Sequence, residues 1–354
     1  MSSRRPPIVG RFTAEEVGLA SRNRGMPLEA LRYDVTPAGL HYLLIHFDIP
    51  VAEESAWRLE VHGLFNERTS LALDDIRRLP AKTLHVTMEC AGNGRAQMSP
   101  RYPSVPWIEE GVSTAEWTGV VLADLLPALR AEATELVFHG ADRGVDGGVE
   151  HHFARSLSRQ EALRGDVIVA YAMNGAPLPP QHGAPLRLVV PGWYGMASVK
   201  WLRSIEAVDR PFDGLQQVRS YHFRRAAGEK GEPCTLMRVN SLMVPPGIPD
   251  FYTRRRIVRA GRIEIIGRAW SGAGAIKAME FAVDGRWRRV DVVSQRQAHS
   301  WALWKTVWDA APGEYELACR ATDKAGNVQP LEAPWDVTGF GNNGVQRIHV
   351  TVTP

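Results

Sequence analysis

Apolar and polar residues alternate over many short stretches of this chain, a pattern typical of β-strands with one buried face. In one such stretch Leu84, Val86 and Met88 alternate with polar residues, and Cys90 continues the buried parity. A Gly-Asn-Gly sequence follows at 92–94, and it predicts a tight loop because Gly and Asn tolerate positive φ. We therefore expect a strand that ends at a buried thiol, directly before a turn.

The same patterns predict strands and short helices over the first two thirds of the chain. Residues 1–40 show little periodicity and predict an extended arm on the surface. Asn174 and Gly175 predict a hairpin turn, and Ser158 with Glu161 predicts a capping box. Strands are expected over 57–63, 135–139, 167–173, 186–190 and 201–208, short helices over 71–79, 118–130 and 158–163, and a loop over 140–148.

The last third of the chain carries only the strand pattern. Its strands are regularly spaced and separated by glycine turns, which predicts an immunoglobulin-like sandwich. A chain of 354 residues is also too long for one ordinary core. We therefore expect an α+β protein with a mixed α/β domain over 1–232 and a β-sandwich over 233–354. The sandwich strands are expected over 262–270, 276–283, 288–293, 301–308, 315–322 and 345–352.

The composition narrows the possible partners and the compartment. The formal net charge is only +3, so neither a nucleic acid nor a membrane surface is an expected partner. The cysteines Cys90, Cys234 and Cys319 are far apart and odd in number, which indicates a reducing compartment rather than a disulfide framework. Arg4 and Arg5 precede no apolar run, so they do not form a twin-arginine export signal. The expected location is the cytoplasm, or the periplasm if a leader has been removed.

Several polar residues stand where loops leave buried strands. Each of them has an ordinary structural explanation: His182 as a hydrogen-bonded loop residue, Lys200 as a solvated charge, Cys90 as a buried structural thiol. The residue types alone do not decide between these structural roles and a binding site for a soft metal and an anion. The residues concerned are Cys90, Arg95, Asp142, His182, Arg187, Ser198 and Lys200.

The order of several motifs resembles the sulfite oxidase family of molybdenum enzymes. The central motif is Met-Glu-Cys-Ala-Gly-Asn-Gly-Arg at 88–95, and the likeness extends from about residue 40 to the C-terminus. Two late motifs, at 269–272 and 301–304, resemble the dimerisation domain of that family. The remaining motifs that match are at 106–107, 112–117, 171–175, 182–187, 191–192 and 198–201.

The resemblance implies a molybdopterin-binding domain followed by a dimerisation domain, and it assigns roles to individual residues. Cys90 matches the protein ligand of the molybdenum, beside the two sulfurs of one molybdopterin, and a thiolate suits a soft, redox-active metal. The matching cofactor-binding positions are His46, Asp142, His182, Arg187, Ser198 and Lys200. The matching substrate-pocket and catalytic positions are Arg95, Trp107, Tyr221 and Arg347, the last from the second domain.

The activity that the resemblance implies is the oxidation of sulfite with water to sulfate. Two electrons would pass to an external acceptor such as a c-type cytochrome, because no haem-binding motif is visible, and the protein would form a homodimer. Leu44 and Gly94 stand where family members carry arginines, so we expect weaker affinity for sulfite. The alternatives are the same cofactor with another substrate (a sulfur-compound dehydrogenase or an N- or S-oxide reductase) and a cofactor-free binding protein.

Overall fold

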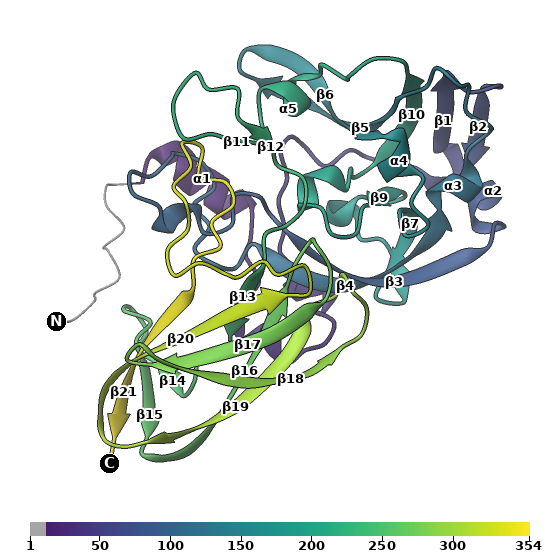
Figure 1. Cartoon of the computed structure of the whole chain (residues 1–354). Helices are drawn as coiled ribbons and strands as arrows, with labels where there is room; N and C mark the ends of the chain where they lie inside the picture. The colour runs from purple at the N-terminus through teal and green to yellow at the C-terminus, as the bar shows by residue number, and fades with distance from the viewer. Residues whose placement is uncertain (1–11) are drawn as a thin grey trace.

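The computed structural model describes residues 12–354, and these residues form two domains that pack closely together (Figure 1). The first domain contains two five-stranded sheets with short helices around them, and the second contains a nine-stranded sheet. A small two-stranded sheet, β11 (His222–Phe223) with β12 (Glu232–Pro233), lies between them in the sequence. Within the described residues, none of the helices has the length and apolar character needed to cross a membrane.

One sheet of the first domain has the strand order β2-β1-β10-β5-β6. β1 pairs with β10 in parallel, and the other neighbours are antiparallel. Leu59 and Val61 of β1 face the core, as the alternation of the sequence predicts. The strands are β1 (Arg58–Gly63), β2 (Thr69–Ala72), β5 (Glu135–Asp146), β6 (Val149–Ser158) and β10 (Leu202–Val208).

The other sheet of this domain has the order β3-β4-β7-β8, and β9 also pairs with β7. All of its pairings are antiparallel. β3 ends at the residue before Cys90, so this sheet supports the thiol. The strands are β3 (Ala81–Glu89), β4 (Val112–Val121), β7 (Ile168–Met173), β8 (Ala176–Pro177) and β9 (Arg187–Val189).

The helices are short and lie at strand ends and on loops. The longest is α1 at the N-terminal end of the described chain. The α-helices are α1 (Ala14–Arg22), α2 (Leu73–Arg77), α3 (Leu122–Leu125), α4 (Arg159–Ala162) and α5 (Leu215–Val218). The 3₁₀ helices are η1 (Leu28–Arg32), η2 (Ala38–Leu40), η3 (Glu54–Ala56), η4 (Arg95–Gln97), η5 (Pro180–His182) and η6 (Gly195–Ala197).

The second domain is a β-sandwich with the strand order β13-β16-β19-β18-β17-β20-β21-β15-β14. The first half of β18, up to Val290, pairs with β17, and its second half pairs with β19, with a register shift between Val292 and Ser294. Met279, Phe281, Trp304, Leu317 and Val350 are fully buried in the core between the strands. The strands are β13 (Asn240–Met243), β14 (Ile248–Pro249), β15 (Arg256–Arg259), β16 (Gly261–Trp270), β17 (Ile276–Val283), β18 (Arg286–Gln295), β19 (Ala302–Ala310), β20 (Gly313–Asp323) and β21 (Gln346–Thr353).

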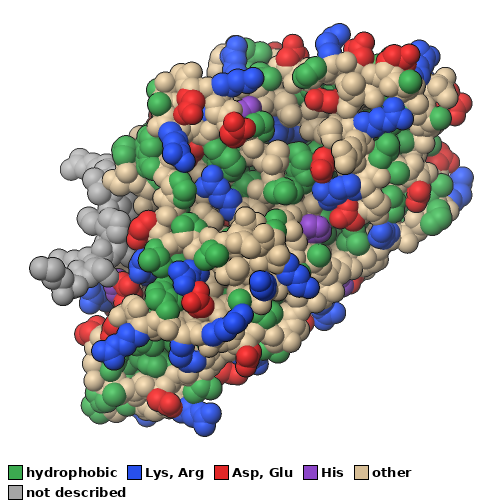
Figure 2. Space-filling model, viewed as in Figure 1, with side chains coloured by type: hydrophobic (Ala, Val, Ile, Leu, Met, Phe, Trp, Pro, Cys, Tyr) green, Lys and Arg blue, Asp and Glu red, His purple; other side chains and the backbone are tan. Residues whose placement is uncertain are grey.

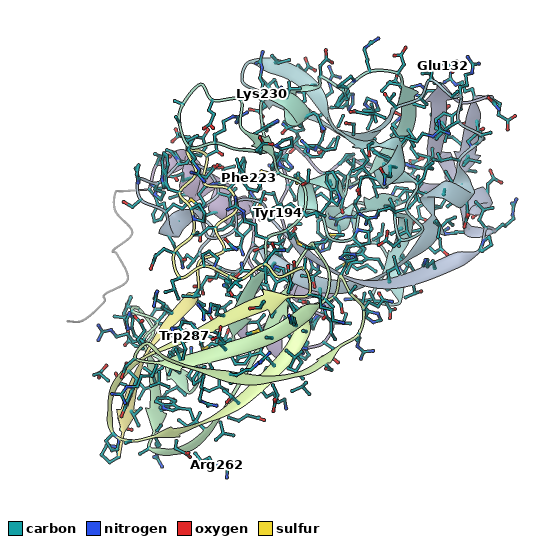
Figure 3. The ribbon with its side chains drawn as sticks, viewed as in Figure 1. Glu132, Tyr194, Phe223, Lys230, Arg262 and Trp287 are labelled. Carbon is teal, nitrogen blue, oxygen red and sulfur yellow. The ribbon has the colours of Figure 1, made fainter. Side chains whose placement is uncertain are left out.

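The two domains share a continuous apolar core. Trp270 and Trp301 of the second domain belong to the same buried cluster as the core residues of the first. Tyr194 and Phe223, labelled in Figure 3, lie at this junction with ring centroids 6.4 Å apart. The guanidinium of Arg238 lies 4.2 Å from the centroid of the Phe223 ring. The second domain is therefore packed against the first rather than tethered to it.

Most of the predicted elements are present, and three predictions are wrong. The predicted helix over 118–130 is instead the end of β4 followed by α3, because β4 continues to pair with β7 up to Val121. The predicted loop over 140–148 is largely a hairpin, with only Gly147 and Gly148 at the turn. The described part of the predicted N-terminal arm contains α1 and the fully buried Leu31. The rest of that arm, residues 1–11, lies outside the described residues.

Candidate active site

The site is built around Cys90, the residue after the last residue of β3. Pairing of β3 with β4 extends to Glu89, and the Cys90 amide then donates to the carbonyl of Gly111 at 2.8 Å. The chain turns sharply after the thiol, and Gly94 has a φ of +79° that favours glycine. Cys90 is only 7% exposed. The predicted strand that ends at a buried thiol before a tight turn is confirmed.

A first cavity, with an empty volume of about 610 Å³ that includes space open to solvent, is lined by Cys90 and brings together most of the predicted residues. It is formed by residues of the first domain that are far apart in the sequence. The six positions predicted to bind the cofactor all line it, together with the thiol and the predicted catalytic tyrosine. They are His46, Asp142, His182, Arg187, Ser198 and Lys200, with Cys90 and Tyr221.

This first cavity contains two cations that suit an anionic group, the buried Arg187 and the half-buried Lys200. Lys200 Nζ donates to the carbonyls of Leu44 and Gln181 at 2.9 and 3.2 Å. Burial lowers the pKa of Lys200 to about 7 and that of Arg187 to about 10, because each charge loses the water that would stabilise it. Burial likewise raises the pKa of Asp142 to about 6, against the nearby charge of Lys200. A phosphate bound here would form charge-assisted hydrogen bonds with both cations.

Two further polar atoms in the first cavity have no hydrogen-bond partner among the described residues. One is Nε of Arg187, and the other is Nε2 of His41. Nδ1 of His41 lies 2.9 Å from the carbonyl of Tyr42, so it carries the proton and Nε2 is an acceptor. Burial lowers the pKa of His41 to about 3, which keeps the ring neutral. The residues that line the cavity thus include a buried donor and a buried acceptor without partners, polar groups that suit a ring system with polar edges such as a pterin.

His182 is buried beside this cavity, and His46 is half-buried there. Burial, with nearby cations, lowers the pKa of His46 to about 3 and that of His182 to about 2. Both rings are therefore neutral at physiological pH, and each supplies one donor and one acceptor. Nε2 of His46 is in hydrogen-bond contact with the hydroxyl of Tyr221. This contact joins a predicted cofactor residue to a predicted catalytic residue.

A second cavity, with an empty volume of about 1170 Å³ that opens to solvent, is also lined by Cys90. It contains Arg95 and Trp107, the two remaining first-domain positions predicted for substrate. Leu44, His46, Cys90 and Tyr221 line both cavities, so the two meet at the thiol. Further lining residues not predicted from the sequence are Arg219, Arg224, Thr338 and Phe340.

Arg95 is held in a fixed position in the second cavity. Its Nε donates to the carbonyl of Thr338 at 3.0 Å, and its guanidinium lies 5.2 Å from the centroid of the Phe340 ring. The side chain is buried, which lowers the pKa of its guanidinium. Trp107 is buried next to it, and its indole N–H has no acceptor at hydrogen-bond distance among the described residues. Both groups can donate to an oxyanion close to the thiol.

The prediction that Arg347 reaches the substrate pocket is wrong. Arg347 lies on β21, where its guanidinium pairs with Glu316 and Glu332 at 3.1 and 3.3 Å, and it lines neither cavity. The reason is strand parity, because the buried neighbours Gln346 and Ile348 take the inner face of β21. The second domain does reach the pocket, but it does so with the segment 336–342.

The donor set fits a metal that is held mainly by an organic cofactor. Residues 12–354 contain no group of three or more His, Cys, Asp or Glu side chains placed to hold a metal ion. Cys90 is instead a single thiol between two cavities, and burial raises the pKa of that thiol while the charge of Arg95 opposes the rise. Binding to a metal keeps such a thiol deprotonated.

Two family models match consecutive parts of the chain. The oxidoreductase molybdopterin binding domain matches residues 46–216, and the Mo-co oxidoreductase dimerisation domain matches residues 233–353. Sulfite oxidase of Gallus gallus is 32% identical over 332 residues, which cover 86% of this chain and 70% of that protein. The chain belongs to the sulfite oxidase family of molybdopterin-dependent oxidoreductases. Its cofactor is therefore molybdenum held by molybdopterin.

Other relatives show how widely this domain pair is used. Mitochondrial sulfite oxidase of Homo sapiens is 32% identical, with 90% of this chain and 62% of that protein covered. An NADH nitrate reductase of Lotus japonicus is 30% identical, with 93% of this chain and 40% of that protein covered. The sulfane dehydrogenase SoxCD from Paracoccus pantotrophus has the same fold, with a TM-score of 0.81 at 24% identity over 100% of this chain and 95% of that one. The chain thus spans less than two thirds of the length of the human relative.

Proposed function

We propose that this protein is a molybdenum-dependent oxidoreductase that transfers an oxygen atom from water to a small sulfur oxyanion. For sulfite, the balanced reaction is sulfite plus water giving sulfate, two protons and two electrons. The observation that carries the proposal is the position of Cys90, which lines both a cation-containing cavity and an arginine-containing cavity. A thiol between two anion sites suits a metal centre that holds its cofactor on one side and meets its substrate on the other.

In this proposal, residues of the first cavity bind the cofactor and residues of the second cavity bind the substrate. Lys200 and Arg187 would bind the cofactor phosphate, and Cys90 would be the protein ligand of the molybdenum. When bound, the molybdenum cofactor supplies the two-electron redox step and the exchange of an oxygen atom with water. Arg95 and Trp107 would orient the oxyanion by donating hydrogen bonds.

Tyr221 would move protons at the reacting centre. Tyr221 lines both cavities, and its hydroxyl contacts Nε2 of His46, a ring that stays neutral. Burial raises the pKa of the Tyr221 phenol, so the hydroxyl stays protonated and can donate to substrate or water. Two protons leave for each sulfite oxidised, and the hydroxyl of Tyr221 would pass on one of them.

A second candidate is a related enzyme that acts on a less charged sulfur compound or on an N- or S-oxide. The observation that favours it is the apolar part of the second cavity, where Leu44, Val105 and Phe340 stand close to the predicted metal ligand. Apolar walls suit a substrate with an uncharged or organic part. Arg95 still favours a negative group on that substrate, and the nitrate reductases among the relatives indicate that oxyanions other than sulfite suit this family.

We also propose the partners of the reaction. The match to a dimerisation domain over 233–353 supports a homodimer formed through the second domain. The two electrons would pass to an external acceptor, and a c-type cytochrome has a suitable one-electron cofactor. Size-exclusion chromatography with light scattering would check the dimer, with a monomeric mass as the opposing outcome.

Metal analysis and a substrate panel test the proposed function. The protein is purified from a host that makes molybdopterin, and molybdenum is measured by mass spectrometry. We expect about one molybdenum per chain, and reduction of an artificial acceptor with sulfite. In Cys90→Ser, kcat should fall at least about a thousandfold, since a hydroxyl is a poor ligand for this metal. A wild-type protein without molybdenum would refute the proposal, and turnover only with other substrates would favour the second candidate.

A further inference from the structure

The loop that carries Cys90 is held in place by the second domain. Five hydrogen bonds connect residues 89–95 to second-domain segments that are far away in the sequence. The backbone amide of Gly341 and the side chains of Asn342, Trp270 and Asn240 donate to this loop, while Arg95 donates in the opposite direction. The pairs are Gly341 N to Ala91 O at 2.7 Å, Asn342 Nδ2 to Gly94 O at 2.8 Å, Arg95 Nε to Thr338 O at 3.0 Å, Trp270 Nε1 to Glu89 Oε2 at 3.0 Å, and Asn240 Nδ2 to Glu89 Oε1 at 3.1 Å.

Glu89 is the centre of this connection. It is the residue before Cys90, it is 2% exposed, and its carboxyl accepts from the side chains of Trp270, Asn240 and Asn93. All three partners are N–H donors, so a carboxyl group with acceptors on both oxygens matches them. A buried polar group of this kind is costly to leave unsatisfied, so it defines one arrangement of its neighbours.

The contacts of Glu89 continue as a closed ring around Cys90. Asn93 donates to Glu89 at 3.0 Å and accepts from the amide of Gly111 at 2.9 Å. The carbonyl of Gly111 accepts from the amide of Cys90 at 2.8 Å, and the amide of Asn93 donates to the carbonyl of Cys90 at 2.9 Å. Both backbone groups of Cys90 are therefore fixed by residues that Glu89 orients directly or through Asn93.

We propose that Glu89 is a positioning residue through which the second domain fixes the sulfur of Cys90 relative to the cofactor cavity. The second domain would then contribute to catalysis, in addition to forming a dimer. Misplacing a reacting group by about 1 Å can cost on the order of a hundredfold in rate. The kinetic part of this inference rests on the proposed function, whereas the structural part concerns the cofactor-free chain as well.

A pair of matched tryptophan variants tests the inference. Trp270→Phe removes the N–H that reaches Glu89 and keeps an aromatic ring in the core. Trp301→Phe is the control, because Trp301 is also a buried second-domain residue that donates its indole N–H to the first domain, at 2.8 Å to the carbonyl of Asp34. Both variants lose one hydrogen bond between the domains, but only Trp270→Phe loses one to the Cys90 loop.

Two readouts separate positioning from simple stabilisation. In the cofactor-free full chain, the rate of alkylation of Cys90, followed by peptide mass spectrometry, should rise at least about fivefold in Trp270→Phe and less than twofold in Trp301→Phe. In the loaded enzyme, Trp270→Phe should alter the electron paramagnetic resonance spectrum of the half-reduced molybdenum and lower kcat about tenfold with KM within twofold. Equal behaviour of the two variants in both readouts would overturn the inference.

A second variant, Glu89→Gln, tests the same contact from its acceptor side. In Glu89→Gln, at least one N–H of the new amide faces another donor, because all three partners of Glu89 are donors. The double variant should lose less stability than the sum of the single variants, since both remove the same contact. If the losses of stability in the two single variants add up in the double variant, Glu89 and Trp270 are not coupled and the inference is contradicted. A wild-type chain without molybdenum would refute the proposed function but leave the alkylation result to decide this inference.

Discussion

The two cavities that meet at Cys90 are built in different ways. The cofactor cavity is formed entirely by first-domain residues, several at strand ends, and its two cations are the buried Arg187 and the half-buried Lys200. The substrate cavity is larger and takes its walls from α1, from first-domain loops and from the second-domain segment around Thr338 and Phe340. This difference indicates that the fold fixes the cofactor side, while the substrate side can change through loops without disturbing it.

Among the variants that test the difference between the two cavities, Lys200→Met is expected to have the largest effect, a loss of bound molybdenum. Loss of the charge removes a charge-assisted hydrogen bond of about 1.5–3 kcal/mol to an anionic group, which corresponds to tenfold or more in affinity. Molybdenum content after expression in a molybdopterin-producing host should therefore fall at least about tenfold. Lys277→Met, at an exposed position of β17, is the control and should retain its metal. Full metal content in Lys200→Met would break the assignment of the cofactor cavity.

Arg95→Gln tests the substrate cavity by removing a charge there, as Lys200→Met does in the cofactor cavity. The amide of Gln can still donate a hydrogen bond, but it cannot offer a positive charge to an oxyanion. We expect KM for sulfite to rise about 10- to 100-fold in steady-state assays with molybdenum content unchanged. Arg219→Gln, an exposed position of the same cavity, should raise KM less than about fivefold because solvent screens its charge. Lost metal in Arg95→Gln would show that the two cavities are not separable.

Leu44→Arg sharpens the comparison by adding charge on the substrate side. The Leu44 carbonyl accepts from Lys200, and this backbone contact does not depend on the side chain. The new guanidinium would strengthen oxyanion binding, so KM for sulfite should fall about three- to tenfold. Leu44→Met keeps the volume without the charge and should leave KM unchanged. An unchanged or higher KM in Leu44→Arg would count against a small oxyanion as the substrate.

A separate effect, measured as a free energy of unfolding, concerns the stability of the cofactor-free protein above neutral pH. Lys200 has a pKa of about 7 in the folded chain, against the usual 10.5 of a lysine in water, so above pH 7 the unfolded chain binds more protons. Stability should therefore rise with pH from about 7 to 9, by up to about 1.4 kcal/mol per pH unit. Urea midpoints of wild type and Lys200→Met at pH 7, 8 and 9 measure it. Equal slopes in both proteins would contradict a buried charge at Lys200.

The sequence predicts the cofactor side better than the substrate side, for a physical reason. The strand that ends at Cys90 and the hairpin at Asn174 and Gly175 follow from local patterns, and the structure confirms both. The helix α1 also had a local signal that was missed, the capping box of Thr13 and Glu16. Thr338 and Phe340 had none, because only the packing of the second domain against the first brings them to Cys90.

Arg347 shows where analogy along the sequence fails. A resemblance assigned it to the pocket, but the alternation of β21 places its side chain beside Glu316 instead. The predicted helix over 118–130 failed for a related reason, since pairing of β4 with β7 outweighs the helical spacing of the leucines and valines. In both cases the local structure depends on strand pairing between distant parts of the chain. Short-range sequence patterns carry no information about that pairing.

X-ray absorption at the molybdenum edge tests the central claim most directly. If Cys90 is the protein ligand, the loaded wild type should show three sulfur atoms bound to molybdenum, two from the cofactor and one from the chain. Loaded Cys90→Ser should then show two. Two sulfurs in both proteins, or three in both, would contradict the role of Cys90 on which the proposed enzyme depends.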